Sequence, residues 1–262
     1  MPRISLLLIL ATLPIILICF YIYSKDKNKE PIKLLLKLFF FGILSCILVV
    51  CITELIYVFI PFMNKNFNQM SFIEILFYSF IIVALIEEFC KWLMVYKIGY
   101  NNKEFDEVYD IVVYSVFVSL GFAFLENLLY VLLNNSISVG ISRGLLSVPG
   151  HACDAIFMGY YLSLAKRYRK NNDRQNEKKN INKSILIPVL LHGIYDFCIF
   201  SGQNIFIIIF FVFIINLYII SIKRLKQTAN ITTKLFYKNN FCPNCGAKIQ
   251  GDFCSNCGLR QE

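Results

Sequence analysis

Acidic, basic and imidazole side chains interrupt otherwise apolar stretches of this sequence. Glu87, Glu88 and Lys91 share one such stretch, and the chain's only two histidines, His151 and His192, lie in two others. An ionised side chain at the centre of a lipid-spanning helix costs about 2.5–3.5 kcal/mol on insertion scales, so such residues are candidates for function by default. Paired carboxylates with two imidazoles are the groups that activate a water molecule. These residues therefore predict a water-activating site.

Helical spacing brings several of these groups onto common faces. Lys91 follows Glu87 by four residues and Glu88 by three, so on a helix its ammonium can neutralise either carboxylate. Each histidine also has an aspartate about one turn later. The two pairs are His151 with Asp154 and His192 with Asp196. Such an aspartate can accept the second ring N–H, which fixes the tautomer and raises the basicity of the other nitrogen, whether that nitrogen holds a metal or a water.

A purely structural interpretation competes with this one. Polar residues inside spans also form interhelical hydrogen bonds that hold a bundle together. That interpretation is strongest for Lys91, Asn127 and Asp154 taken singly. It is weaker for the two glutamates and two histidines as a set, because their combination suits acid–base chemistry.

The elements that must position these residues follow from composition. Of the 262 residues, 57% are hydrophobic and 16% are charged, against about a quarter charged in typical soluble domains. The mean hydropathy is +0.61, and the apolar residues form blocks of about twenty, the length that a lipid-spanning helix requires. This excludes a soluble protein. We predict an all-α, polytopic transmembrane helix bundle with about seven spans.

The predicted spans are separated by short connectors rich in lysine and asparagine. They cover residues 4–23, 38–60, 72–96, 111–133, 145–165, 184–200 and 205–222. The first apolar run is about twenty residues long and no small-residue cleavage site precedes Lys25, so we interpret it as a retained span rather than a secretory signal. Small residues beside the polar set should let the helices approach closely. They are Gly121, Ala123, Gly144, Gly150, Ala152, Gly159 and Gly193.

Basic residues predict the orientation. Lys and Arg concentrate in connectors 24–37, 97–110 and 166–183 and after the last span, whereas the other side has only Arg3, Lys65 and Arg143. The positive-inside rule therefore puts the N-terminus outside and the C-terminus in the cytosol, which agrees with an odd number of spans. The net charge of +9 is then a consequence of topology, and no nucleic-acid partner is expected.

Four of the ten cysteines form a separate pattern in the tail. Cys242 and Cys245 make one C-x-x-C-G knuckle, and Cys254 and Cys257 make a second. This spacing is typical of a structural four-cysteine Zn²⁺ site, and a cytosolic location disfavours the alternative, disulfides. We predict a zinc ribbon over 241–259, joined by a linker over 227–240 to a membrane domain over 1–226. We expect it to dock an unknown cytosolic partner.

At this point the sequence resembles the PrsW family of intramembrane proteases, which is distantly similar to the CAAX prenyl proteases. Four motifs between about residues 70 and 200 carry the resemblance, and no motif position is lost. They are E-E-x-x-K at 87–91, G-F-x-x-x-E-N at 121–127, Arg143 followed by His151 and Gly159, and H-G-x-x-D at 192–196. The zinc tail and flanking spans lie outside this motif core.

The resemblance implies an intramembrane endopeptidase of a bacterial cell membrane whose best-known role is site-one cleavage of a single-span anti-sigma factor in stress signalling. On this view Glu87 or Glu88 is the general base. His151 and His192 hold a divalent metal such as Zn²⁺, or hold the water directly. Glu126 is a third ligand or an orienting carboxylate, and Asn127 could donate to an oxyanion.

The sequence alone leaves three alternatives. The first is a metal-free glutamate mechanism, which would use the same residues; the sequence has no H-E-x-x-H motif that would indicate a metal. A proton-coupled transporter could also use buried acids with His and Lys, although the spans show no obvious inverted repeat. A non-catalytic membrane scaffold acting through the zinc ribbon is the third alternative.

Overall fold

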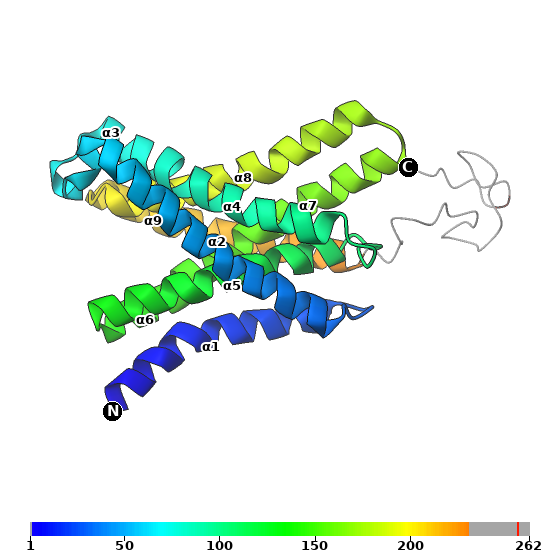
Figure 1. Cartoon of the computed structure of the whole chain (residues 1–262), viewed down its shortest axis with the longest axis horizontal. Coiled ribbons are helices and arrows are strands. Elements are labelled where there is room, and N and C mark those ends of the chain that lie inside the picture. Colours follow the sequence, from blue (N-terminus) through cyan, green and yellow to red (C-terminus); the bar gives the residue numbers. More distant parts are fainter. Residues whose placement is uncertain (1, 231–255, 257–262) are drawn as a thin grey trace.

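The computed structural model describes residues 2–230 and residue 256, and this part of the chain is a bundle of helices without a β-strand (Figure 1). The all-α prediction is confirmed. The helical segments follow one another as α1 (Pro2–Lys25), α2 (Ile32–Phe59), η1 (Pro61–Asn64), η2 (Phe67–Gln69), α3 (Phe72–Phe77), η3 (Tyr78–Leu85), α4 (Ile86–Met94), η4 (Val95–Tyr100), α5 (Asp110–Asn134), α6 (Ile137–Ser142), η5 (Arg143–Ser147), α7 (Val148–Lys170), α8 (Arg174–Phe200) and α9 (Asn204–Asn230). The predicted zinc ribbon and its linker lie almost entirely outside the described residues.

Five helices of the described chain are long and apolar enough to cross a membrane. They are α1, α2, α5, α8 and α9, and each overlaps a predicted span. The other two predicted spans fall on composite helices that run without a break over 72–100 and 137–170. In these two runs α-helical turns alternate with the π-helical segments η3, η4 and η5. The protein is therefore a multi-pass membrane protein, and the count of seven spans stays a prediction.

The basic connector over 166–183 is more helical than predicted. α7 continues to Lys170, and α8 begins at Arg174 after a tight turn in which Asn172 adopts a φ of 58°. The Asp173 side chain caps α8 by accepting a hydrogen bond from the Asn176 backbone N–H. The apolar pattern that marks a span ends where the lipid ends, but a helix of Lys, Arg, Glu and Gln continues into water because these residues favour helices.

α5 forms the centre of the bundle and packs against α1, α2 and α7. Its first half is buried almost completely, including Tyr114 and Phe122. Close contact with α2 depends on two glycines: a Cβ atom on Gly121 would lie 2.0 Å from the Phe39 carbonyl oxygen, and one on Gly42 would lie 2.0 Å from the Val118 carbonyl oxygen. The predicted role of Gly121 in close helix approach is thus confirmed.

The acidic turn between η4 and α5 is packed into the protein and is not a solvated loop. Glu107 and Asp110 are buried, and the Asp110 carboxylate accepts hydrogen bonds from the backbone N–H groups of Asp106 and Glu107. The connector between α1 and α2 covers this turn, because Asn28 donates to Glu107 and Tyr114 of α5 donates to Glu30. Charge alone could not reveal this packing, since the covering loop is distant in sequence.

Candidate active site

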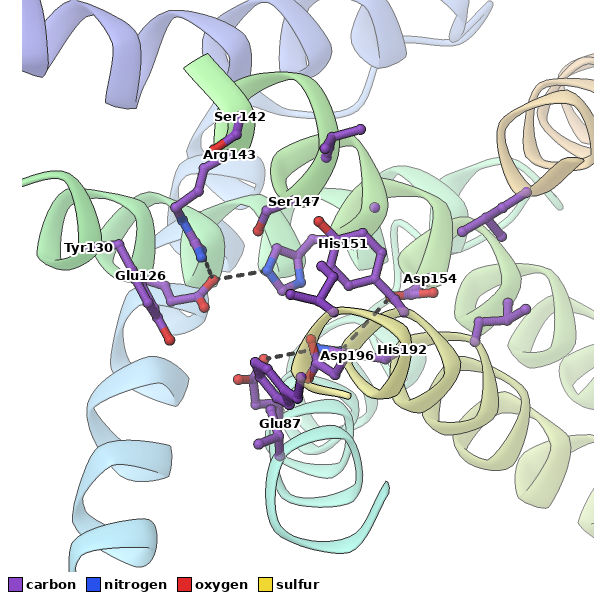
Figure 2. Close-up of a pocket in the computed structure, with 18 of the residues that line it drawn as sticks. Glu87, Glu126, Tyr130, Ser142, Arg143, Ser147, His151, Asp154, His192 and Asp196 are labelled. Carbon is purple, nitrogen blue, oxygen red and sulfur yellow. Dashed lines mark hydrogen bonds and ion pairs between the residues drawn. The ribbon is translucent and has the colours of Figure 1, made fainter. Parts of the chain in front are cut away.

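Four helical runs bring the predicted site residues together in the middle of the bundle. Glu87, Glu88 and Lys91 come from α4, Glu126 from α5, His151 and Asp154 from α7, and His192 and Asp196 from α8. Each of these side chains except Glu126 is less than a tenth exposed. The predicted grouping is therefore present in the fold, and Figure 2 shows the labelled side chains converging on one space.

π-helical turns lie shortly before the segment that carries Glu87 and the segment that carries His151. η3 ends two residues before Glu87, and η5 ends four residues before His151. Pro149 in the first turn of α7 has no N–H to donate to the preceding turn, which accounts for the break in α-helical bonding there. Such wide turns change the direction of the following side chains and are frequent at functional sites.

The Lys91 ammonium lies between the two carboxylates and His151. Its Nζ atom is 2.8 Å from Glu88 Oε1, 3.2 Å from Glu87 Oε2 and 3.2 Å from His151 Nδ1. An ammonium group can only donate hydrogen bonds, so His151 Nδ1 accepts. A neutral His151 then carries its proton on Nε2 and donates it to Glu126 Oε2, 2.9 Å away.

His192 contacts carboxylates through both ring nitrogens. Nδ1 is 2.9 Å from Glu88 Oε1, while Nε2 is 3.4 Å from Asp196 Oδ2 and 3.9 Å from Glu87 Oε2. Asp154 lies 4.0 Å from Nδ1. The predicted His192–Asp196 pair is in ion-pair contact, but the hydrogen bond of His192 goes to Glu88. The predicted pair of His151 with Asp154 does not appear, because His151 turns to Glu126 instead.

Arg143 is part of the site, although the sequence analysis did not include it among the site residues. Its Nη2 atom is 2.7 Å from Glu126 Oε2, its Nε donates to Asn127 Oδ1, and its guanidinium stacks on the Tyr130 ring. Asn127 in turn donates its amide N–H to the Ala11 carbonyl of α1. The Asn127 carbonyl and one of its two amide N–H groups are thus engaged within the bundle. Its spacing in the sequence could have indicated that Arg143 belongs to the site, because it lies eight residues, or about two helical turns, before His151.

A cavity of about 410 Å³ borders this cluster. Its polar wall is made by Glu87, Glu126, His151, Asp154, His192 and Asp196. Glu88 and Lys91 do not line it, and both are completely buried behind the wall. Apolar and aromatic side chains complete the cavity towards the end of the bundle where α5 and α8 terminate, including Tyr78, Tyr130 and Phe200. The two adjacent glutamates therefore occupy different environments.

The donor set suits a divalent cation. Glu87, Glu88, His151 and His192 each offer a ligand atom, and these atoms lie within 4.8 Å of one another. Glu88 Oε2 is buried and has no hydrogen-bond partner in the described chain, as expected of an atom that could take a further ligand. Two imidazoles with carboxylates are a common zinc donor set. The residues present thus fit a metal ion.

The chain is similar to known proteins of one family. The family described as PrsW family intramembrane metalloprotease matches residues 30–220. Protease PrsW of Clostridioides difficile (strain 630) is 33% identical over 237 residues, covering 89% of this chain and 95% of that protein. Protease PrsW of Oceanobacillus iheyensis is 40% identical over 215 residues, covering 82% and 92%, and that of Bacillus subtilis (strain 168) is 36% identical over 185 residues, covering 70% and 78%. No solved structure gives a significant match.

Proposed function

This chain belongs to the PrsW family of intramembrane metalloproteases and is a membrane-embedded peptidase, and on that premise we propose that Glu87 activates the water that attacks the peptide bond. One observation carries the assignment. Of the adjacent carboxylates, Glu87 lines the cavity, whereas Glu88 lies behind it between Lys91 and His192. A general base must reach the proton that it removes, so the residue with access to the cavity is the better candidate.

The neighbouring groups have supporting roles in this proposal. His192 Nε2 faces Glu87 and the cavity, where it can hold the attacking water or bind a metal. Glu88 orients that imidazole by accepting the hydrogen bond from Nδ1, and Asp196 and Asp154 add negative charge beside the ring. Glu126 acts as an orienting carboxylate for His151, because it accepts the Nε2–H and is itself held by Arg143.

The metal centre belongs to the same proposal. A divalent ion such as Zn²⁺ would be held by Glu88, His151 and His192, three of the four clustered groups that offer ligand atoms, so that Glu87 stays free to act as the base. When bound, the ion would supply a Lewis acid that polarises a carbonyl group or a water. The protein itself contributes orientation through the carboxylates behind each imidazole. It also excludes bulk water, because the cluster is buried within the bundle.

The substrate we propose is a membrane protein, with a single-span anti-sigma factor as the candidate that the family resemblance suggests. The cavity extends to the end of the bundle opposite the basic connectors. By the positive-inside rule that end faces away from the cytosol of a bacterial cell, so the cut would fall on the extracytoplasmic side of the lipid bilayer. The C-terminal tail would then be cytosolic. There Cys242, Cys245, Cys254 and Cys257 would hold a structural Zn²⁺ and dock a partner.

Cleavage of a single-span reporter by purified protein tests the function. We expect two fragments whose masses place the cut in the reporter's span or at its extracytoplasmic end. Alanine variants of Glu88 and His192 should lose the activity, and Glu54→Gln, which alters an exposed carboxylate of α2, should retain it. Substrate-dependent proton flux in liposomes without any reporter cleavage would contradict the proposal and support a transporter.

A further inference from the structure

Lys91 is buried to an unusual degree for a lysine, and its ammonium group has a full set of partners. Its relative exposure is 0%. Its three N–H groups point to three acceptors, Glu87 Oε2, Glu88 Oε1 and His151 Nδ1, at 2.8–3.2 Å. The Phe122 ring closes the remaining side, with Nζ 4.1 Å from the ring centroid. A buried ammonium requires this kind of complete compensation.

The three acceptors of Lys91 are three of the four groups that could hold a metal. Glu87, Glu88 and His151 belong to that set together with His192. The carboxylates each have a second oxygen, so they could contact a cation in another way. His151 has no such freedom: its Nε2–H is donated to Glu126, and its single lone pair, at Nδ1, is engaged by Lys91.

We propose that the Lys91 ammonium is a built-in cation that occupies the metal position, so that a divalent ion can bind His151 and Glu88 only when the ammonium leaves. Two cations about 3 Å apart in a buried site repel strongly, which makes simultaneous occupancy unfavourable. The exchange needs little backbone movement, because Lys91 has a flexible four-carbon stem. Lys91 is thus a positioning residue that keeps the carboxylates and His151 in place while no metal is bound.

The inference rests on the metal centre of the proposed function but not on peptide-bond cleavage, and metal affinity tests it directly. The experiment uses the full-length chain with the four tail cysteines replaced by serine, so that the tail contributes no metal. Bound Zn²⁺ is measured by elemental analysis after dialysis against buffers of fixed free Zn²⁺, and Co²⁺ spectra report the ligand geometry. Lys91→Met, similar in length but uncharged, should bind metal at least tenfold more tightly than the parent.

Two matched variants separate the position of Lys91 from its charge. Lys91→Arg keeps a cation in the centre and should bind no more tightly than the parent. Lys97→Met removes a charge from the same helical run, in η4 and away from the cluster, and should leave the affinity unchanged. Adding Glu88→Gln to Lys91→Met should weaken metal binding again, because it removes a ligand charge.

The proposal is overturned if Lys91→Met binds Zn²⁺ no more tightly than the parent. If Lys91→Met does not fold, the parent protein decides the question by itself. An ammonium in the centre predicts that the parent exchanges its metal during dialysis, whereas one tightly retained equivalent that depends on His151 would contradict the inference. Reporter cleavage is measured separately on the same samples, so a failed metal prediction and a failed peptidase assignment are distinguishable.

Discussion

Arg143 joins three helical runs around one carboxylate. It contacts Glu126 and Asn127 of α5 from η5, and Asn127 links this pair to α1. Because Glu126 fixes the proton of His151 on Nε2, the guanidinium acts on the imidazole through an intermediate group. Arg143 is therefore a positioning residue whose removal should disturb the orientation of His151 more than the binding of substrate.

Arg143→Gln should lower kcat by about 10–100-fold, the size of effect seen when an outer-shell partner of an active-site imidazole is removed. KM should change little, and Arg143→Lys should recover part of the rate because it restores the charge but not the fork that holds both α5 residues. Reporter cleavage rates over a range of substrate concentrations separate the two parameters. Arg174→Gln, at the exposed start of α8, is the matched control. An Arg143→Gln enzyme that changes only in KM would contradict the positioning role.

Glu30 lies outside the spans and provides a pH dependence of stability. Burial raises the pKa of Glu30 from 4.5 to about 7, and the nearby Asp26 carboxylate adds to the rise, while the hydrogen bond from Tyr114 opposes it. Between pH 4.5 and about pH 7, Glu30 therefore keeps its proton in the folded protein but has lost it in the unfolded chain. Stability should fall as the pH rises through this window.

Glu30→Gln should remove this contribution to the fall in stability, because the amide stays neutral and its carbonyl can still accept the hydrogen bond from Tyr114. Between about pH 5 and pH 8 the thermal midpoint of the parent should fall more than that of Glu30→Gln, measured in detergent by near-UV circular dichroism. Glu54→Gln serves as the exposed control. Equal pH slopes for the parent and Glu30→Gln would show that this carboxylate does not titrate in the window.

At the residue scale, the sequence predicted membership of the site better than the roles within it. The i,i+3 and i,i+4 spacing correctly paired Lys91 with both glutamates and His192 with Asp196. It could not separate Glu87 from Glu88, because that difference depends on which side of α4 faces the cavity. It also paired His151 with its neighbour in sequence, whereas the fold supplies Glu126 from another helix.

At the scale of elements, the crossing of α2 and α5 is the contact that most constrains side-chain size. Gly121→Ala would place a methyl group against the Phe39 backbone, which cannot yield as a flexible side chain does. We expect a loss of about 1–3 kcal/mol in unfolding free energy, the usual range for overpacking. The unfolding midpoint in mixed micelles measures it.

Gly150→Ala is the matched control for Gly121→Ala. Its added methyl group would lie 3.7 Å from the nearest atom of Tyr195, an ordinary contact, and alanine favours a helix over glycine. Its midpoint should stay equal or rise. Equal destabilisation by both substitutions would show that close α2–α5 contact is not the cause.

The helices themselves were predictable, but the irregular turns within them were not. Apolar blocks of about twenty residues predicted that α1, α2, α5, α8 and α9 exist, although α2 and α8 begin before their predicted spans and α9 ends after its own. Nothing in the residue pattern marks η3 or η4 as π-helical, since their side chains are those of an ordinary span. Such turns result from packing against neighbouring helices, which a single sequence does not contain.

At the scale of the whole molecule, the buried site and the cysteine tail should be separable. The motif residues of the site all lie between 87 and 196, and the tail begins after the last span. Deleting residues 238–262 should therefore leave membrane insertion and reporter cleavage intact while removing one tightly bound zinc per chain. Membrane fractionation, the cleavage assay and elemental analysis test these three points. A truncated chain that fails to insert or to cleave would give the tail a role in folding or catalysis.

The distribution of charge over the bundle supports both the orientation and the chemistry that we propose. Basic residues collect in the connectors at one end, whereas the site's carboxylates, Glu87 among them, gather in the interior. Reporters with tags on either side of the span would show which fragment is released, and we expect release of the extracytoplasmic one.

The most direct measurement of the central claim is the initial rate of reporter cleavage by purified Glu87→Gln. Glutamine preserves the size and polarity of the side chain but cannot accept the proton of the attacking water. We expect a rate at least about 100-fold below that of the parent, within the range for loss of a general base. Cleavage by Glu87→Gln at the parent rate would contradict it.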